Sequence, residues 1–303
     1  MSDLAPRDTD ATPKLGTGTG YTLLAASGFA AVSILTSLAT RTGLSLSTVL
    51  AWRYVLSAVV LVTWVGSQTY PKRMRANEAL RWMAVGGGGQ ALLVYLALSS
   101  LAYISAATLA FLFYTYPAWV AVVQTVRGAE RLDARRVAAL LLSFTGTVLM
   151  VGMLDTRGTE WRGYALALGA AMLYGAFIPT MQWMQKDWPV AVTSAYSKIG
   201  AGFCFLVLSA SDRTFQFALP GPAWAAIIAL TLWSTVLPSV FFMMGLIRLG
   251  PVRTAIVSTV EPFLTAVLGA LVLGQPLTLR TVGGGVAIVA AVIVLQFRRT
   301  RVA

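Results

Sequence analysis

YTYPAWVAVVQTVRGAERLDARR (residues 114–136) decides the fold of this chain, because its pattern returns in STVEPFLTAVLGALVLGQPLTLR (residues 258–280). The matched residues, each pair 145 positions apart, are Pro117 with Pro262, Glu130 with Gln275, Leu132 with Leu277 and Arg135 with Arg280. Chance similarity between apolar sequences is the alternative explanation, and the loop charges described below argue against it. The repeat divides the chain into two halves of similar structure.

The composition identifies the solvent of this fold as a lipid bilayer. Of the 303 residues, 57% are hydrophobic and 11% are charged, whereas soluble domains contain about 25% charged residues. A bilayer core about 30 Å thick takes roughly 20 residues of helix, so each long apolar run predicts one transmembrane helix. The runs lie at 19–40, 47–67, 82–102, 104–126, 135–154, 162–184, 190–210, 222–246, 251–273 and 279–297.

Five runs fall in each half, and an odd number makes the second half enter the membrane from the opposite side. The sequence therefore predicts an all-α integral membrane protein whose ten transmembrane helices form two inverted five-helix repeats around a central cavity, an arrangement typical of secondary transporters. The predicted units are a disordered cytoplasmic tail at 1–17, a first repeat at 18–154, and a second repeat at 155–303 that ends in a short basic tail.

The basic residues predict the orientation. Residues 1–17 contain Asp3, Asp8 and Asp10, the wrong charge for the start of a signal peptide. With a cytoplasmic start, the basic loops 72–81 and 127–136 lie inside, as the positive-inside rule requires. We therefore expect a multi-pass protein of the bacterial inner membrane with both termini in the cytoplasm. This orientation explains the net charge of +12 without a nucleic-acid partner, so the expected partners are lipid and a small-molecule substrate, with the chain a monomer or weak homodimer.

Three longer stretches support a family resemblance. They are WRYVLSAVVL (52–61), LALSSLAYISAATLAFLFYTYPAWVAVV (96–123) and GPVRTAIVSTVEPFLTAVLGALVLGQPLT (250–278), the last followed by GGGVAIVAAVIVL (283–295). With them the chain resembles the EamA-type branch of the drug/metabolite transporter superfamily over nearly its whole length after the tail. The resemblance implies ten-helix carriers of small metabolites, with a cavity lined mainly by helices 1, 3, 4, 6, 8 and 9.

Three charged residues, Arg53, Lys198 and Glu261, lie well inside the apolar runs, away from their ends. A charge at the centre of the bilayer costs at least about 2.5–3.5 kcal/mol, and such residues usually face the protein interior or a cavity. Glu261 precedes Pro262, which removes a helix hydrogen bond and leaves polar backbone at the level of the carboxylate. We predict that this carboxylate binds an amine on the substrate or carries a proton during transport. The alternative is a structural ion pair with Arg53 or Lys198. Those two are predicted to be structural charges, paired inside or extending to the membrane interface.

Aromatic and polar residues in the apolar runs are the remaining candidates. Tyr114 and Trp119 lie beside Pro117 in the helix that resembles a cavity wall, and their rings suit a planar or cationic substrate. Helix packing and the interfacial aromatic belt are the alternative explanations. Pro117 and Pro262 are predicted to act in gating because each interrupts its helix. The other predicted substrate-binding residues are Gln90, Tyr95, Tyr174, Trp183 and Trp233.

The function classes left open are few. No histidine is present, and Cys204 is the single cysteine, which we interpret as a small apolar side chain. We therefore expect no metal, no cofactor and no enzymatic activity, because no pair of acid–base groups is visible. The glycine runs 86–89 and 283–285 lack the context of a phosphate loop, and we expect close helix packing or local unwinding there. The sequence favours a secondary carrier that exports an amino acid or an amphipathic cation by alternating access. The alternatives are a passive facilitator or exchanger and, from other classes, a membrane-embedded enzyme, a pore or a scaffold.

Overall fold

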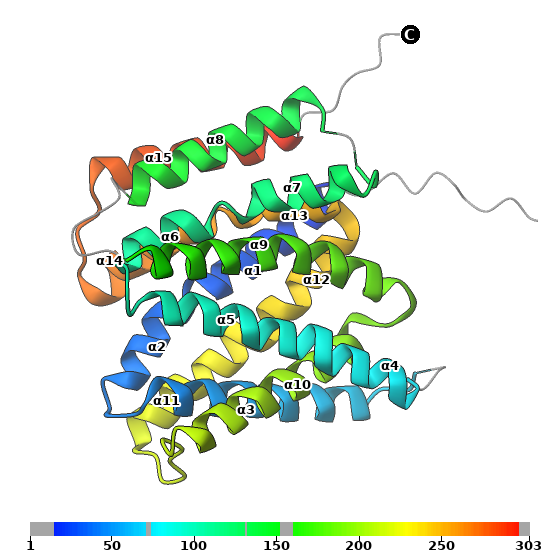
Figure 1. Ribbon diagram of the computed structural model, residues 1–303, viewed down its shortest axis with the longest axis vertical. Helices are drawn as coiled ribbons and strands as arrows, with labels where there is room; N and C mark the ends of the chain where they lie inside the picture. Colours follow the sequence, from blue (N-terminus) through cyan, green and yellow to red (C-terminus); the bar gives the residue numbers. More distant parts are fainter. Residues whose placement is uncertain (1–14, 71–73, 131, 152–159, 297–303) are drawn as a thin grey trace, which may run out of the picture.

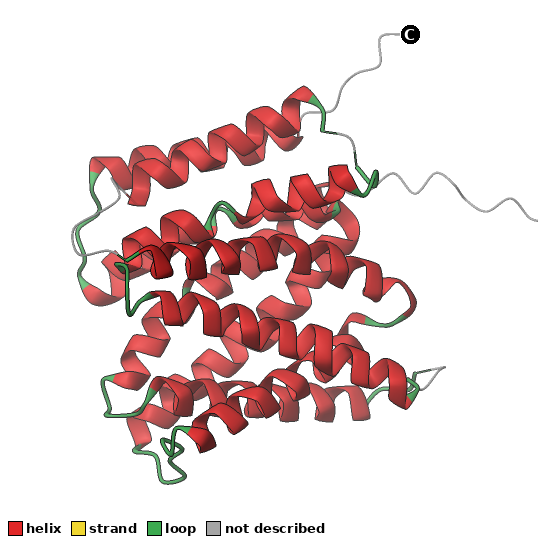
Figure 2. Ribbon diagram, in the orientation of Figure 1, coloured by secondary structure: helices red, strands yellow, loops and turns green. Residues whose placement is uncertain are grey.

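The computed structural model describes residues 15–70, 74–130, 132–151 and 160–296, and these residues form helices and turns without a strand (Figure 2). The helices are α1 (Leu15–Ala30), α2 (Val32–Thr40), α3 (Leu46–Gly66), α4 (Ala76–Arg81), η1 (Trp82–Gly88), α5 (Gly89–Ser100), α6 (Ala106–Phe113), α7 (Tyr116–Val126), α8 (Ala134–Val151), α9 (Trp161–Met184), η2 (Gln185–Asp187), α10 (Val190–Ser211), α11 (Gly221–Thr231), η3 (Leu232–Val236), α12 (Leu237–Leu249), α13 (Pro251–Ser258), α14 (Glu261–Leu273) and α15 (Leu279–Gln296).

Eight stretches within the described residues are long and apolar enough to cross a membrane. They are Leu15–Thr40, Leu46–Gly66, Ala76–Ser100, Ala106–Val126, Trp161–Met184, Val190–Ser211, Gly221–Leu249 and Pro251–Leu273. Each coincides with one of the predicted apolar runs. The remaining two runs correspond to α8 and α15, which pack side by side along one edge of the molecule (Figure 1). The chain is thus an all-helical protein with multiple membrane-spanning helices, while the count of ten and the inverted topology stay predictions.

Two spans break at equivalent places. The helix stops at Tyr114–Thr115 between α6 and α7, and again at Thr259–Val260 between α13 and α14. The two breaks are 145 residues apart, which is the spacing of the sequence repeat. Each is followed by a proline in the first turn of the next helix, Pro117 in α7 and Pro262 in α14. Proline has no N–H to donate and its ring crowds the carbonyl four residues back, so an unbroken α-helix is disfavoured at both places.

The glycine run 86–89 lies where η1, a stretch of π-helix, approaches α10. A Cβ atom added to Gly87 would lie 2.5 Å from the backbone nitrogen of Ala201, so only glycine permits this approach. In the run 283–285, Gly284 of α15 lies against the backbone of Gly146 in α8. These contacts confirm that both runs serve helix packing.

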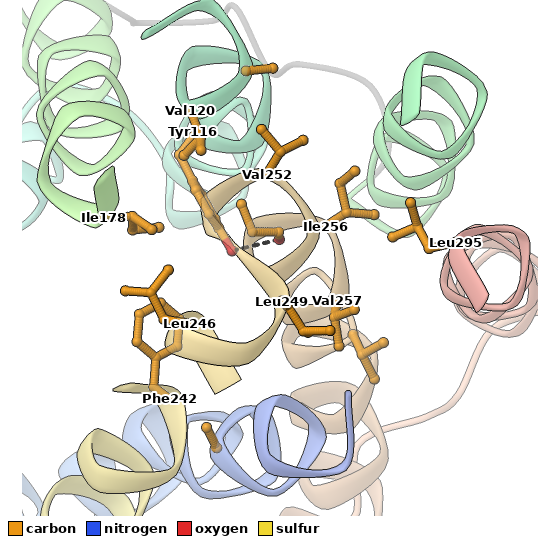
Figure 3. Close-up of a cluster of buried hydrophobic side chains, with 14 of the residues drawn as sticks. Tyr116, Val120, Ile178, Phe242, Leu246, Leu249, Val252, Ile256, Val257 and Leu295 are labelled. Atoms are coloured by element: carbon orange, nitrogen blue, oxygen red, sulfur yellow. Dashed lines mark hydrogen bonds between the residues drawn. The ribbon is translucent and has the colours of Figure 1, made fainter. Parts of the chain in front are cut away.

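The packing of the two halves follows a reciprocal pattern. Helix α1 of the first half packs on α12 of the second half, and α9 of the second half packs on α5 of the first. The α3 and α10 helices pack on each other (Figure 1). A large apolar core lies between α7, α9, α12, α13 and α15, where the hydroxyl of Tyr116 donates a hydrogen bond of 3.3 Å to the carbonyl of Ala255 (Figure 3).

The N-terminal tail requires one correction. Residues 1–14 of the predicted tail lie outside the described residues, but Leu15 to Thr17 are helical rather than disordered. The reason is packing: Leu15 contacts the apolar core, and one turn later Gly18 lies against Leu249 of α12. The first helix therefore begins before the apolar run that predicts it.

Candidate functional site

A cavity of about 340 Å³ lies between helices of both halves of the chain. Its polar lining residues are Arg53, Gln90, Thr193, Ser194, Ser197, Lys198, Ser239 and Glu261. Its aromatic lining residues are Phe29, Tyr54, Trp82, Phe113, Tyr174, Phe177 and Phe242. All three charged residues predicted within the apolar runs therefore line one space.

Arg53 enters the cavity from the first part of α3, and its side chain is 6% exposed. Its Nε donates to the hydroxyl of Thr235 at 2.6 Å, and its Nη2 donates to the carbonyl of Ser234 at 3.1 Å. Both acceptors belong to η3, the π-helical stretch that interrupts the span from α11 to α12. Arg53 thus ties α3 to an irregular stretch of another span.

Lys198 reaches the cavity from α10, and its side chain is 3% exposed. Its Nζ donates a hydrogen bond of 2.8 Å to Oε1 of Gln90 in α5. Tyr54 lies beside both cations: the Arg53 guanidinium is 5.2 Å from the centroid of its ring and the Lys198 ammonium is 5.4 Å away. Such cation–π contacts help to stabilise desolvated cations. Both side chains are buried against the cavity and neither is exposed on the surface of the molecule.

Glu261 is the first residue of α14, directly after the break at Thr259–Val260, and its half-buried side chain lines the cavity. The side chain of Tyr114, at the equivalent break in the first half, lies near its carboxylate. The salt bridge found among the described residues joins Arg136 and Glu130 at 3.2 Å, away from the cavity. Among the described residues, Glu261 therefore has neither Arg53 nor Lys198 within the 4.0 Å of a direct ion pair.

Aromatic rings form one wall near Glu261. Tyr174 of α9 stacks on Phe113 of α6 with ring centroids 5.6 Å apart, and it contacts Tyr116 at 4.7 Å. Phe177, one turn further along α9, continues the wall. The aromatic cluster predicted around residues 111–119 therefore reaches the cavity through Phe113.

The structure brings Gln90, Tyr174 and Glu261 to the cavity, with Tyr114 beside Glu261. It does not bring Tyr95, Trp183 or Trp233 there, since their side chains are 52%, 61% and 56% exposed on the surfaces of their helices. An aromatic ring on the lipid-facing side of a span suits the bilayer as well as a cavity does.

Trp119 has a packing role, because its Cβ lies directly against Gly175 of α9. Pro117 is buried in the core and Pro262 lies in the first turn of α14, so both mark helix breaks rather than lining the cavity.

Sequence reasoning missed the face of α10 that lines the cavity. Ser194, Ser197 and Lys198 are spaced i, i+3 and i+4, which places them on one side of the helix. A polar stripe in an otherwise apolar span was the available signal. Tyr54 carried no signal of its own, because an aromatic residue next to an arginine is ordinary in a membrane helix.

Comparisons with known proteins bear on the identity of this chain. The model of the EamA-like transporter family matches residues 16–152 and 161–297, once for each half of the chain. The chain belongs to this family. It is accordingly a membrane transporter of the drug/metabolite transporter type, and members of the family are transporters rather than enzymes.

A solved structure described only as "Crystal structure of protein" has the same fold. Its TM-score is 0.76 at 17% sequence identity, and the match covers 93% of this chain and 96% of the other. At this identity the likeness concerns the fold alone. A comparison with curated proteins finds no match. Within the described residues no group of three or more His, Cys, Asp or Glu side chains is placed to hold a metal ion.

Proposed function

We propose that this EamA-like transporter is a secondary carrier of the bacterial inner membrane that exports a small organic metabolite, either an amino acid or an amphipathic cation. The observation that carries the proposal is the cavity between the two halves, which combines charged groups with an aromatic wall. A cavity of this volume suits a small metabolite, and its polar groups lie where a substrate would otherwise meet only apolar side chains.

The positions of the helix breaks support alternating access. The breaks at Tyr114–Thr115 and Thr259–Val260 lie at equivalent places of the repeat and beside the cavity, where Tyr114 meets Glu261. A broken helix has fewer backbone hydrogen bonds to hold it straight, so it can bend there at low cost. Rocking of the spans that contain α6–α7 and α13–α14 would open the cavity first to one side and then to the other.

The driving force separates two versions of the proposal. Glu261 is the acidic residue that lines the cavity, so proton antiport would use its carboxylate. A passive facilitator or exchanger would use the same cavity without moving a proton. Transport of a substrate at a rate that does not change with an imposed pH gradient would exclude obligatory proton coupling.

Uptake into proteoliposomes tests the proposed function. The full chain is reconstituted and assayed with labelled amino acids and organic cations, and wild type is compared with Glu261→Gln under set pH gradients. Saturable, substrate-specific uptake is expected, with a loss or an altered pH dependence in Glu261→Gln. The control is Glu160→Gln, which removes a carboxylate from the exposed N-cap of α9. Non-saturable flux would indicate a pore, and no flux from folded protein would favour a scaffold.

A further inference from the structure

The side chains that line the cavity include two cations and one carboxylate. Arg53 and Lys198 are both nearly fully buried and both lie against the ring of Tyr54. Within the described residues, neither has a carboxylate within 4.0 Å. Glu261 lines the same cavity and is paired with neither of them. With all three groups ionised, the lining carries a net charge of +1.

Buried charges without a counter-ion are costly in a membrane protein. The desolvation of each cation is several kcal/mol, and only an opposite charge or several hydrogen bonds offset it. Two like charges around one ring add repulsion to this cost. Such a pair is expected where a ligand supplies the missing anion.

Donor groups remain for such a ligand. The Lys198 ammonium has three N–H donors, and the structure assigns one hydrogen bond to it, with Gln90. The Arg53 guanidinium has five N–H donors, and the two assigned bonds use Nε and Nη2. Both groups line the cavity, so the remaining donors have a space in which to meet an anion.

We propose that Arg53 and Lys198 form an anion subsite that binds the carboxylate of the transported substrate. The inference rests on the proposed carrier function and narrows its substrate to compounds that carry a carboxylate. The net charge of +1 disfavours a substrate with a cationic group alone. Glu261 then takes the amine of the same molecule, so a zwitterionic amino acid meets an opposite charge at each of its two ends and leaves the net charge of the lining at +1. Gln90 positions the Lys198 ammonium by accepting its hydrogen bond.

A matched series of ligands tests the subsite. Thermal stabilisation of the purified full chain in detergent is measured with each of the common amino acids and with the amine that lacks only its carboxylate. We expect at least one amino acid to bind, and its decarboxylated amine to bind at least about tenfold more weakly, as the loss of a charge-assisted hydrogen bond implies. Amines that bind as tightly as their amino acids, or the absence of any carboxylate-dependent stabilisation, would overturn the proposal.

Substitutions assign the effect to the subsite. Lys198→Met keeps the length of the side chain and removes its charge, so we expect the preference for the amino acid over its amine to fall at least about tenfold. Lys198→Arg keeps the charge and should retain a preference. The control is Arg248→Met in α12, which removes a cation that lies over the ring of Tyr21, outside the cavity. An unchanged preference in Lys198→Met would overturn the proposal, and the wild-type series decides if that variant does not fold.

The same ligands separate this inference from the proposed function. Binding that depends on the carboxylate but leads to no flux in proteoliposomes would contradict the carrier and leave the anion subsite standing. Flux of amines and amino acids at equal rates would contradict the anion subsite and leave the carrier standing.

Discussion

Nζ of Lys198 lies 2.8 Å from Oε1 of Gln90, and this hydrogen bond joins α10 of the second half to α5 of the first across 108 residues of sequence. A glutamine side chain holds the ammonium by its dipole alone, without neutralising it. The bond therefore fixes a positive charge at the wall of the cavity and leaves that charge free to meet an anion.

Removing the partner of Lys198 should cost stability. In Gln90→Leu the buried ammonium loses an acceptor, so we expect a decrease of about 1–3 kcal/mol in the free energy of unfolding. Thermal unfolding in detergent measures the change. Gln68→Leu, at an exposed position after α3, is the control and should leave the stability nearly unchanged. Equal stability of the two variants would show that the bond between Lys198 and Gln90 does not hold the cation.

The hydroxyl of Thr235 has a similar role for Arg53. Thr235→Val keeps the shape of the side chain but removes the acceptor 2.6 Å from Nε, so we expect destabilisation of about 1.5–3 kcal/mol, the range for hydrogen bonds to charged groups. Thr63→Val in the exposed part of α3 is the matched substitution, since its hydroxyl bonds only its own helix. Both variants are compared by the same unfolding assay, and the account is contradicted if Thr63→Val is the more destabilised.

Neighbouring glycines in η1 should differ sharply in their tolerance of a methyl group. A Cβ at Gly87 would meet the backbone of α10, whereas a Cβ at Gly88 has nothing within 4 Å. We expect Gly87→Ala to lose about 1–3 kcal/mol of stability or to fail to fold, as overpacking does, and Gly88→Ala to unfold like wild type. Similar unfolding temperatures for the two variants would mean that α10 does not lie against η1 as described.

The predicted orientation can be tested with single cysteines. In a Cys204→Ser background, Thr42→Cys lies in the connection between α2 and α3. Asn77→Cys lies in α4, at the start of the span Ala76–Ser100, which follows the far end of α3. The basic loops predict that Thr42→Cys reacts with a membrane-impermeant maleimide in intact cells and that Asn77→Cys reacts only after permeabilisation. The reverse pattern would invert the chain in the membrane.

The fold was largely predictable from the sequence, and the site only in part. Pro117 and Pro262 mark helix breaks because proline lacks a backbone N–H, and this property can be recognised in the sequence itself. The side of a membrane helix on which an apolar or aromatic residue lies cannot be predicted from the neighbouring sequence. Lipid and the protein interior are both apolar, so such residues show no periodic pattern. This is why Trp233 and Trp183 were expected in the cavity although they lie on the outer surface, while Tyr54 was missed.

The contact of Arg53 and Lys198 with Tyr54 is a second feature that could not be predicted from the sequence. The sequence placed both within spans, but only the fold shows that they come from α3 and α10 to a single ring, Tyr54. Their separation in sequence gives no indication of this contact. The bonds of Arg53 to η3 and its place beside the cavity were not readable from the sequence.

Counterflow tests the central claim, a carrier that alternates the access of one cavity, most directly. Proteoliposomes are loaded with an unlabelled amino acid that the chain binds and are then diluted into a trace of the labelled compound. The account predicts a transient accumulation of label above the outside concentration, and its loss in Lys198→Met but not in Arg248→Met. Equilibration of label without any overshoot would contradict alternating access and indicate a pore.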